Sequence, residues 1–198
     1  KNTLITLEKY KKDLQSKIEN EKNLEKFFIR HTLNGQLYSL FEYLKIKKKL
    51  TNFFVSSADY KFYLSSKKFN QFLQNKNPDI VILTTSWNDF AYEEISNYGF
   101  VNSNSSELVT RIEEKPSKNS ISVDINSLLI GTFWFKSSEL IFRMMKENKT
   151  NNELFIAKTI NNYLSEFKVY KFNVDHWLSL GTPKELQLAE YWIDFFKS

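Results

Sequence analysis

The run IVILTT at residues 80–85 constrains the fold more than any other stretch of this sequence, because it is apolar along most of its length and carries no charge. A continuous run of this kind is typical of a central parallel strand that is buried on both faces. It follows SKKFNQFLQNK (66–76), where we expect a helix. Upstream, NGQLYSLFEYL (34–44) predicts an amphipathic helix whose apolar face is made of Leu37, Leu40, Phe41 and Leu44. NFFVSSAD (52–59) predicts a strand. This alternation predicts an α/β fold, with a sheet sandwiched by helices.

The remaining elements are expected on the same grounds. Near the start, LEKYKKDLQSKI (7–18) places Leu7, Tyr10, Leu14 and Ile18 on one helical face, and KFFIRH (26–31) predicts a short strand. After residue 85 we expect three strands without intervening helices, then two helices and a last strand: YGFVN (98–102), LVTRIEE (108–114), LLIGTFWFK (128–136), SSELIFRMMKEN (137–148), ELFIAKTINNYLSEF (153–167) and KVYKFNV (168–174). SVDINS (122–127) is expected to be a mobile surface loop. The sheet should therefore be mixed.

The closing segment GTPKELQLAEYWIDFF (181–196) carries a strong helix-start signal. Thr182 is the expected N-cap, Pro183 suits the first helical position, and Glu185 completes a capping box. The helical period gives this helix an apolar face, made of Leu186, Ala189, Ile193 and Phe196.

Composition limits the class of protein. The chain has 198 residues, enough for one domain with a substantial core, and we expect a single domain over residues 1–198. No apolar run is long enough to cross a bilayer, and no signal peptide opens the sequence. Cysteine is absent, which excludes disulfides and suits a reducing cytoplasm, although other compartments are compatible with it.

The charge pattern does not indicate a nucleic-acid partner. The net charge is +5, and the densest basic cluster, KIKKK (45–49), is best explained as the solvated end of a helix. Basic residues interleaved with aromatic ones across a face, as nucleic-acid binding requires, are not seen. We therefore expect neither a nucleic acid nor a membrane as partner, whereas a polyphosphate would suit the charge.

Asp59 ends the strand predicted at residues 52–59. It could be an ordinary turn residue or a helix N-cap. It could also bind a metal or a substrate, because open α/β sheets bind ligands at the carboxyl ends of their strands.

Seven short motifs, in order, carry a resemblance to a known family. They are NGQLYSL, FFVSSAD, YGFV, IEEKP, GTFWFK, NNELFI and LGTPKEL. Together they resemble the sugar-phosphate nucleotidyltransferases, especially the bacterial capsule and surface-polysaccharide type, and they cover essentially the whole chain. The resemblance implies a Rossmann-like three-layer fold with a mixed, mostly parallel central sheet. It corresponds to about the last three-quarters of a family domain, and the sequence starts at Lys1 without a Met. We therefore expect an N-terminal β-loop-α segment before Lys1.

The resemblance also implies a reaction. A phosphorylated sugar, small alcohol or amide would attack the α-phosphorus of a nucleoside triphosphate, with CTP favoured, and pyrophosphate would leave. A homo-oligomer is compatible with it. Two alternatives stay open: a degenerate nucleotidyltransferase fold kept as a binding domain, and a glycosyltransferase of related fold.

Residue roles on the nucleotide side follow from the matched motifs. Asn34, Gly35 and Gln36 match the segment that lies against the nucleobase, and a side chain at Gly35 would block the approach of the backbone. Asp59 matches the family's metal-binding, catalytic aspartate, a hard oxygen ligand that suits Mg²⁺.

The acceptor side has its own matches. Tyr98 and Gly99 match a backbone approach to the acceptor, and Gly131 and Thr132 match a second turn that lines it. In the EKP motif, Glu114 would bind acceptor hydroxyls, while Lys115 would hold the acceptor phosphate and act in catalysis. Glu153 is best interpreted as a helix cap.

Two family features are missing. No stretch resembles the glycine-rich GxGxR loop, and the aspartate that many members carry just before the closing GT is replaced by Leu178, Ser179 and Leu180. Asp175 could substitute only if the chain turns, because four residues of extended strand span about 13 Å.

His31 and His176 are expected to be structural or rim residues, and Trp134 and Trp192 to pack in the interior.

Overall fold

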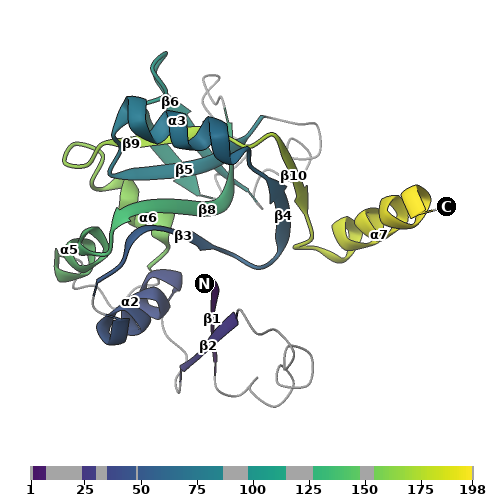
Figure 1. Ribbon diagram of the computed structural model, residues 1–198, viewed down its shortest axis with the longest axis horizontal. Helices are drawn as coiled ribbons and strands as arrows, with labels where there is room; N and C mark the ends of the chain where they lie inside the picture. Colours follow the sequence, from purple (N-terminus) through teal and green to yellow (C-terminus); the bar gives the residue numbers. More distant parts are fainter. Residues whose placement is uncertain are drawn as a thin grey trace. The chain divides into compact units, whose positions relative to one another are not determined.

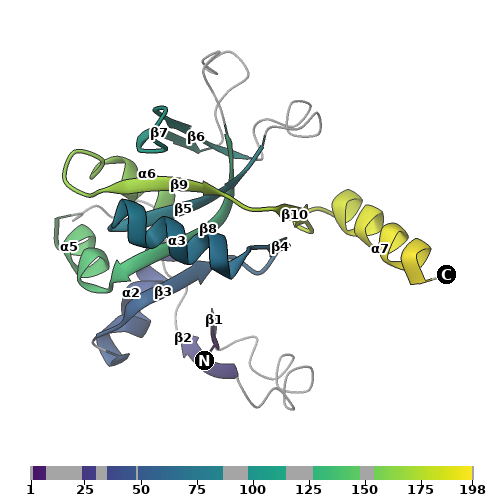
Figure 2. The same ribbon diagram turned by 45° about the horizontal axis from the view of Figure 1, so that its top comes forward.

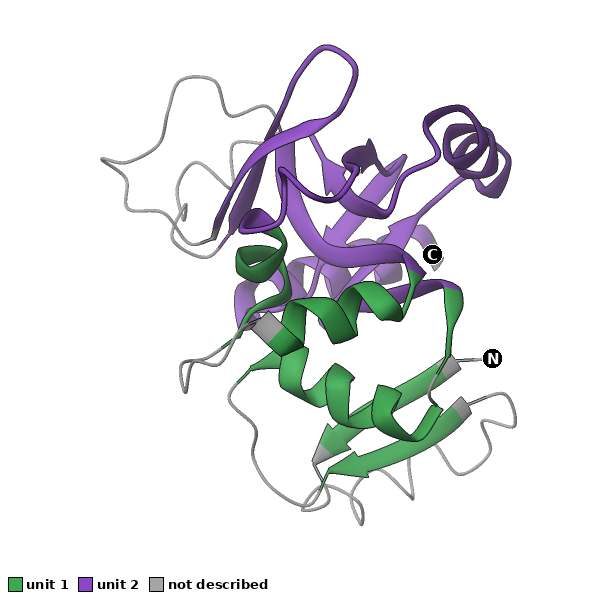
Figure 3. Ribbon diagram, turned by 90° about the vertical axis from the view of Figure 1, so that its left-hand side faces the viewer, with its two compact units in different colours: residues 1–51, 137–160 green, residues 52–136, 161–198 purple. Residues whose placement is uncertain are grey.

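The structure is a computed structural model in which most of the chain can be described. The described residues are 2–7, 24–29, 35–47, 49–86, 98–114, 127–147 and 154–197. The chain divides into two compact units, residues 1–51 with 137–160 and residues 52–136 with 161–198 (Figure 3). The expectation of one domain over residues 1–198 stays a prediction.

The first unit contains a parallel pair of strands. Strand β1 (Asn2–Leu7) pairs with β2 (Leu24–Ile29) from Asn2 opposite Leu24 to Leu7 opposite Ile29. The sequence predicted β2 but not β1. Leu7, expected on a helix, is the last residue of β1, whose NTLITL sequence is rich in β-branched residues that favour strands. The rest of the helix predicted over 7–18 lies outside the described residues.

Helix α2 (Gln36–Lys47) packs as its sequence predicted. Leu37, Leu40 and Leu44 are buried. On the same helix, Phe41 contacts Phe142 of α5 (Glu139–Glu147) edge to face, with ring centroids 5.6 Å apart. The periodicity therefore identified the buried face of α2.

Helix α6 (Ile156–Asn161) is shorter than the predicted 153–167. Turns follow it through Glu166, and a bend at Phe167 leads into the next strand. Of the predicted loop SVDINS, only its last residue, Ser127, is described, and it is already in a strand.

A six-stranded mixed sheet forms the centre of the second unit. Its order is β7-β6-β8-β5-β9, and β3 also pairs with β8. The strands are β3 (Thr51–Ser56), β5 (Ile80–Thr85), β6 (Gly99–Ser103), β7 (Val109–Glu114), β8 (Ser127–Ser137) and β9 (Val169–Asn173).

Strand β5 is central, as its apolar sequence predicted. Ile80, Val81, Ile82 and Leu83 are fully buried. The strand runs parallel to β9 but antiparallel to β8. The α/β class and the mixed sheet are confirmed, whereas the expected predominance of parallel pairs is not found among the described strands. The reason is that β5 pairs with β8, β8 with β6, and β6 with β7 in the antiparallel sense.

Helix α3 (Ser66–Lys76) covers one face of this sheet, beside β5 and β9 (Figure 2). Its buried Phe69 and Phe72 belong to the same core cluster as Val81, Leu83 and Trp134. Burying a side chain of this size contributes about 1.5–3 kcal/mol. Trp134 is therefore an interior residue, as predicted.

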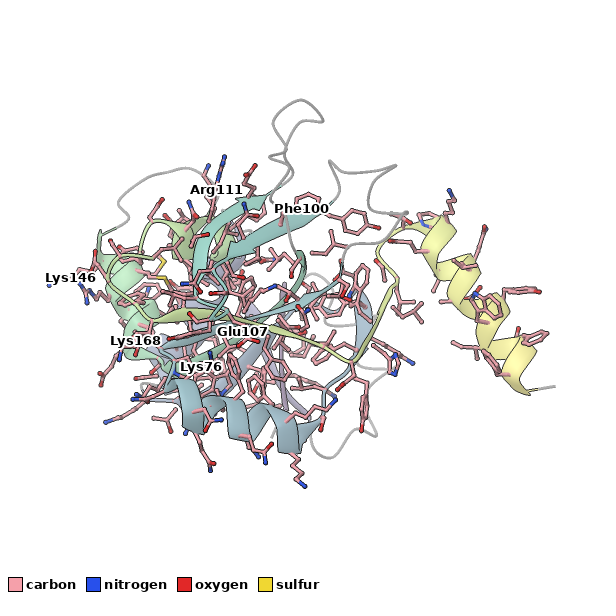
Figure 4. All side chains as sticks on the ribbon, turned by 90° about the horizontal axis from the view of Figure 1, so that it is seen from above. Lys76, Phe100, Glu107, Arg111, Lys146 and Lys168 are labelled. Atoms are coloured by element: carbon pink, nitrogen blue, oxygen red, sulfur yellow. The ribbon has the colours of Figure 1, made fainter. Side chains whose placement is uncertain are left out.

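The connection between β6 and β7 is held by side chains at its tip. The Asn104 side-chain oxygen accepts hydrogen bonds from the backbone N–H groups of Ser106 and Leu108, both at 3.0 Å. The Lys76 ammonium donates to the Ser106 carbonyl at 2.8 Å and lies 3.5 Å from the Glu107 carboxylate (Figure 4). The hairpin is thereby tied to the end of α3.

A separate two-stranded ribbon leads to the last helix (Figure 1). Strand β4 (Tyr60–Tyr63) pairs antiparallel with β10 (His176–Ser179). The sequence did not predict either of them as a strand of its own. Helix α7 (Pro183–Lys197) follows β10 and begins where the capping signal placed it.

The apolar face predicted for α7 is not buried. Ala189 is buried, but Leu186, Ile193 and Phe196 are 44%, 40% and 80% exposed. Trp192, expected to be an interior residue, is 45% exposed, and its ring contacts include Tyr191, Phe195 and Phe196 of the same helix. Periodicity identifies residues that share a face of a helix, but it does not tell whether another surface covers that face. Among the described helices, none is long and apolar enough to cross a membrane.

Candidate functional site

Asp59 lies between β3 and β4, directly against the LGTP turn that precedes α7. The register of the ribbon places Tyr60 opposite Ser179. The Asp59 carbonyl accepts a hydrogen bond from the Leu180 N–H at 2.8 Å, and a Cβ added at Gly181 would lie 3.3 Å from Asp59 Oδ2. The Asp59 side chain is exposed. Two motifs separated by about 120 residues in the sequence therefore meet here, with a solvent-accessible carboxylate at their junction.

Three hydroxyl groups hold the segment that carries Asp59. The Thr132 hydroxyl is buried and lies 2.6 Å from the Tyr60 hydroxyl and 3.1 Å from that of Ser56. Ser56 and Tyr60 are themselves 3.0 Å apart, and the Ser57 N–H donates to the Gly131 carbonyl at 3.3 Å. Burial raises the pKa of Tyr60, and the hydrogen bonds from Ser56 and Thr132 only partly offset this. The Tyr60 hydroxyl therefore keeps its proton and can donate it to the network.

Glu185 forms the capping box that the sequence predicted. The Thr182 N–H donates to Glu185 Oε2 at 2.9 Å, and the Glu185 N–H donates to the Thr182 hydroxyl at 3.2 Å. The same carboxylate has a second function that the capping pattern did not suggest, because the Tyr98 hydroxyl donates to its Oε1 at 2.8 Å.

The charge of Glu185 is stabilised where it lies. Partial burial raises the pKa of Glu185, but the hydrogen bonds that its carboxylate accepts from Tyr98, Ser179 and Thr182 outweigh this, and its pKa lies below the ordinary value. A Cβ at Gly181 would also be 3.8 Å from Glu185 Oε2. Gly181 is thus flanked by the carboxylates of Asp59 and Glu185.

Tyr98, predicted on the acceptor side, is therefore linked to the turn beside Asp59. Its ring also contacts Trp177 of β10 edge to face, with centroids 6.2 Å apart. Gly99 follows as the first residue of β6 and pairs with Glu114 of β7 and Leu129 of β8. A Cβ at Gly99 would lie 2.8 Å from the Leu129 side chain, so packing alone favours a glycine.

The second acceptor turn is closely packed. Gly131 has φ +80°, and a Cβ there would lie 3.3 Å from Ser57 Oγ and from the Tyr60 ring. The Thr132 side chain is fully buried and its hydroxyl is bonded to Tyr60 and Ser56. In this structure the Thr132 side chain therefore supports the segment that carries Asp59. The resemblance implied instead that Thr132 lines the acceptor.

Gly35 lies in the first unit, at the start of α2. Its φ is +110°, and an added Cβ would be 2.4 Å from the carbonyl oxygen of Leu154, which accepts a hydrogen bond from the Leu37 N–H at 3.2 Å. The close approach of the Leu154 backbone therefore accounts for this glycine without a ligand. Gln36 is exposed at the first position of the helix.

Other predicted residues lie outside the described part of the chain. They are Asn34, Lys115, Glu153, His31 and the side chain of Glu114. The predicted roles of these residues stay predictions.

Asp175 does not take the place of the missing aspartate. Residues His176–Ser179 form the extended strand β10, so the chain does not turn and Asp175 lies at the opposite end of the ribbon from Asp59. Its carboxylate instead binds the Lys68 ammonium at 2.7 Å and the Ser65 N–H at 3.1 Å. His176, exposed beside Tyr63, fits the predicted structural or rim position.

Sequence reasoning missed Ser56, Tyr60 and Gly181, and it saw Glu185 only as a cap. SSADY places a serine and a tyrosine four residues apart around Asp59, but no pattern in the sequence indicates that Thr132 would contact both.

In the described residues, no group of three or more carboxylate or imidazole side chains forms a metal site.

The mixed α/β fold is consistent with the family comparison. The model of the nucleotidyl transferase family matches residues 1–193. The chain therefore belongs to the nucleotidyl transferase family. A search of curated proteins gave no match.

Solved structures share the fold. A Bacillus anthracis protein described as a glucose-1-phosphate thymidylyltransferase, solved with sucrose, has a TM-score of 0.74 at 19% identity, over 96% of this chain and 74% of that one. The inositol-1-phosphate CTP transferase of T. maritima has a TM-score of 0.68 at 17% identity, over 94% and 71%. A UDP-glucose pyrophosphorylase solved with UDP-glucose has a TM-score of 0.66 at 14% identity, over 96% and 74%. At these identities the likeness concerns the fold.

Proposed function

We propose that the protein is a nucleotidyltransferase that joins a nucleoside triphosphate to a phosphorylated small molecule. An oxygen of the acceptor phosphate attacks the α-phosphorus and forms a new P–O–P bond. The bond between the α-phosphorus and the oxygen that bridges it to the β-phosphorus breaks, and pyrophosphate leaves with that electron pair. Catalysis of this kind depends on positioning and on charge stabilisation.

The observation that carries the proposal is the junction at Asp59. The SSAD segment and the LGTP turn, both matched to family motifs, are joined by the hydrogen bond from Leu180 to Asp59. Asp59 is exposed there, and the neighbouring residue is a glycine, so no side chain at position 181 covers Oδ2. A carboxylate fixed through its backbone and open on one side suits a ligand role better than that of an ordinary turn residue.

A magnesium ion would suit this site. Mg²⁺ is usually held by one or two carboxylates together with waters and substrate phosphates, so an exposed Asp59 fits it without a full protein cage. When bound, the ion would supply charge stabilisation for the phosphate oxygens. Asp59 would hold the ion, and the Ser56–Tyr60–Thr132 hydroxyls would hold the segment of Asp59.

Tyr98, Gly99 and Glu114 are proposed to bind the acceptor. Support comes from the register of β6 and β7, which pairs Gly99 with Glu114 and so brings two separate family motifs to neighbouring strand ends. Lys115, next in sequence, would neutralise the acceptor phosphate as a point charge. Gly131 and Thr132 would shape the adjoining turn, and Asn34, Gly35 and Gln36 would face the nucleobase.

The finer substrate assignment rests on the resemblance. We favour CTP, an acceptor that is a sugar phosphate or a phosphorylated alcohol or amide, and a role in surface-polysaccharide precursor synthesis in the cytoplasm. The likeness in fold to a protein described as an inositol-1-phosphate CTP transferase is compatible with both preferences.

Replacing Asp59 by Asn tests the proposal. The change keeps the size of the side chain but removes its charge, and we expect pyrophosphate release to fall about a hundredfold to a thousandfold, since each 1.4 kcal/mol of lost transition-state stabilisation costs a factor of ten. The assay would use the full-length protein, Mg²⁺, and CTP, UTP, dTTP or GTP with a panel of phosphorylated acceptors.

Asp175→Asn is the matched control. It makes the same chemical change at an exposed aspartate. The ion pair that Asp175 forms with Lys68 lies at the surface, where such pairs contribute little to stability. Equal rates for Asp59→Asn and the parent would refute the role of Asp59. Tight nucleotide binding by calorimetry without turnover would instead favour a binding domain, and release of nucleoside diphosphate from a nucleotide sugar would favour a glycosyltransferase.

A further inference from the structure

Glu185 contacts two parts of the candidate site that are far apart in sequence. Its Oε2 accepts from the backbone of Thr182, the residue after Gly181, and Gly181 borders Asp59. Its Oε1 accepts from the hydroxyl of Tyr98, 87 residues away in the sequence. A helix cap requires the first contact but not the second.

The contact to Tyr98 is a defined one. The hydrogen bond is 2.8 Å long and partly buried, and the Tyr98 ring is held from another side by Trp177. A hydrogen bond to a charged acceptor is stronger than one between neutral groups, particularly where solvent is partly excluded. Tyr98 is followed at once by Gly99, which pairs with Glu114. The position of the start of β6 is therefore linked, through one carboxylate, to the turn beside Asp59.

We infer that Glu185 is a positioning residue that fixes the acceptor-binding end of β6 relative to the turn beside Asp59. The inference rests on the proposed function, because it assumes that Tyr98–Gly99 faces the acceptor and Asp59 the nucleotide. Transfer of a nucleotidyl group requires the two substrates to be held within a fraction of an ångström of an in-line arrangement, so a rigid link between their binding segments affects the reaction directly. Glu185 touches neither substrate in this scheme and acts through Tyr98 and the turn.

A double-mutant cycle tests the link. Tyr98→Phe removes only the donor hydroxyl, and Glu185→Ala removes its acceptor. We expect each single change to raise the KM for the acceptor about threefold to tenfold, as for the loss of a charge-assisted hydrogen bond, with the KM for the nucleotide changed less than about twofold. The double variant should be no worse than Glu185→Ala, because the two groups act through one bond.

Thr182→Ala is the matched control for capping. It removes the hydroxyl that accepts from the Glu185 N–H but leaves the bond between Tyr98 and Glu185. We expect this variant to lower the free energy of unfolding while the acceptor KM stays within about twofold of the parent, because capping alone affects stability.

The outcomes separate the two proposals. An active parent whose Tyr98→Phe variant has an unchanged acceptor KM, or whose double variant shows additive losses, would overturn the role of Glu185 and leave the proposed function intact. The same holds if Thr182→Ala raises the acceptor KM as much as Glu185→Ala does, since Glu185 would then act as a cap only. A folded parent that releases no pyrophosphate with any nucleotide and acceptor would refute the proposed function, and the positioning role with it.

Discussion

Gly35 and Gly181 both lie in turns that lead into a helix, but their surroundings differ. An added Cβ at Gly35 would meet the Leu154 backbone at 2.4 Å, in a backbone conformation with φ +110°. At Gly181 the nearest atom would be the Asp59 carboxylate oxygen at 3.3 Å, and the Glu185 carboxylate would follow at 3.8 Å.

The difference shows which glycine is informative about function. Gly35 is required by main-chain packing within its own unit, so its presence says little about a ligand. Gly181 borders two charged side chains that could move aside, and its small size leaves one face of Asp59 uncovered. The same residue type thus serves the fold in the first turn and leaves room at the candidate site in the second.

The largest effect on stability is expected from alanine at Gly35, and the same change at Gly181 is its matched comparison. Gly35→Ala should lower the free energy of unfolding by about 3 kcal/mol or more, because a positive φ and a main-chain clash both oppose the new side chain. Gly181→Ala should cost less than about 1 kcal/mol, since a carboxylate at the end of a side chain can rotate away. Denaturant unfolding of both variants measures this contrast. Similar losses would show that the two turns are equally constrained by the fold.

A smaller effect is expected in the hydroxyl network beside Asp59. Tyr60→Phe removes the hydrogen bond to buried Thr132 and should cost about 1–2 kcal/mol of unfolding free energy. Tyr63→Phe, on the same strand at a residue that is 61% exposed, should stay within about 0.5 kcal/mol of the parent. If Tyr60→Phe is equally neutral, the turn near Asp59 does not depend on side-chain hydrogen bonds. The two turns would then not differ in the way proposed, by main-chain packing at Gly35 and by side-chain contacts near Asp59.

The smallest effect concerns the pH dependence of stability. The pKa of Glu185 is lower in the folded protein than its ordinary value of 4.5, so the unfolded chain binds the proton more readily. The stabilisation that this brings is present above pH 4.5 and is lost as the pH falls through the folded pKa. The free energies of unfolding of Glu185→Gln and the parent should therefore differ most near neutral pH and converge in acid. Parallel pH profiles would mean that the Glu185 charge is not stabilised by the fold.

Elements with strong local signals could be predicted from the sequence. The buried run of β5, the apolar stripe of α2 and the capping box of α7 each depend on neighbours in the sequence, and the structure has all three where they were expected. The alternation of helices and strands, and the later run of strands without intervening helices, extended this to the α/β class and the mixed sheet. The lone Asp59 was a reasonable candidate on the same basis.

Features that depend on distant partners could not be predicted. The start of β1 carried no signal apart from β-branched residues, and its pairing with β2 depends on a segment more than fifteen residues away. The exposure of Phe196 and Trp192 depends on which surface, if any, lies over α7. The hydrogen bond from Tyr98 to Glu185 and the burial of Thr132 likewise arise only once the chain has folded.

The β4–β10 ribbon has a consequence for the dynamics of the molecule. A two-stranded ribbon has only one ladder of hydrogen bonds and is marginally stable in isolation, so this one depends on Phe62 and Trp177, which pack against the core. It can open by a local fluctuation that leaves the six-stranded sheet intact, at a free-energy cost below that of global unfolding. Amide protons in β4 and β10 should therefore exchange with solvent sooner than those of β5, and the order of the Asp59 segment is governed by this local equilibrium rather than by the stability of the whole chain.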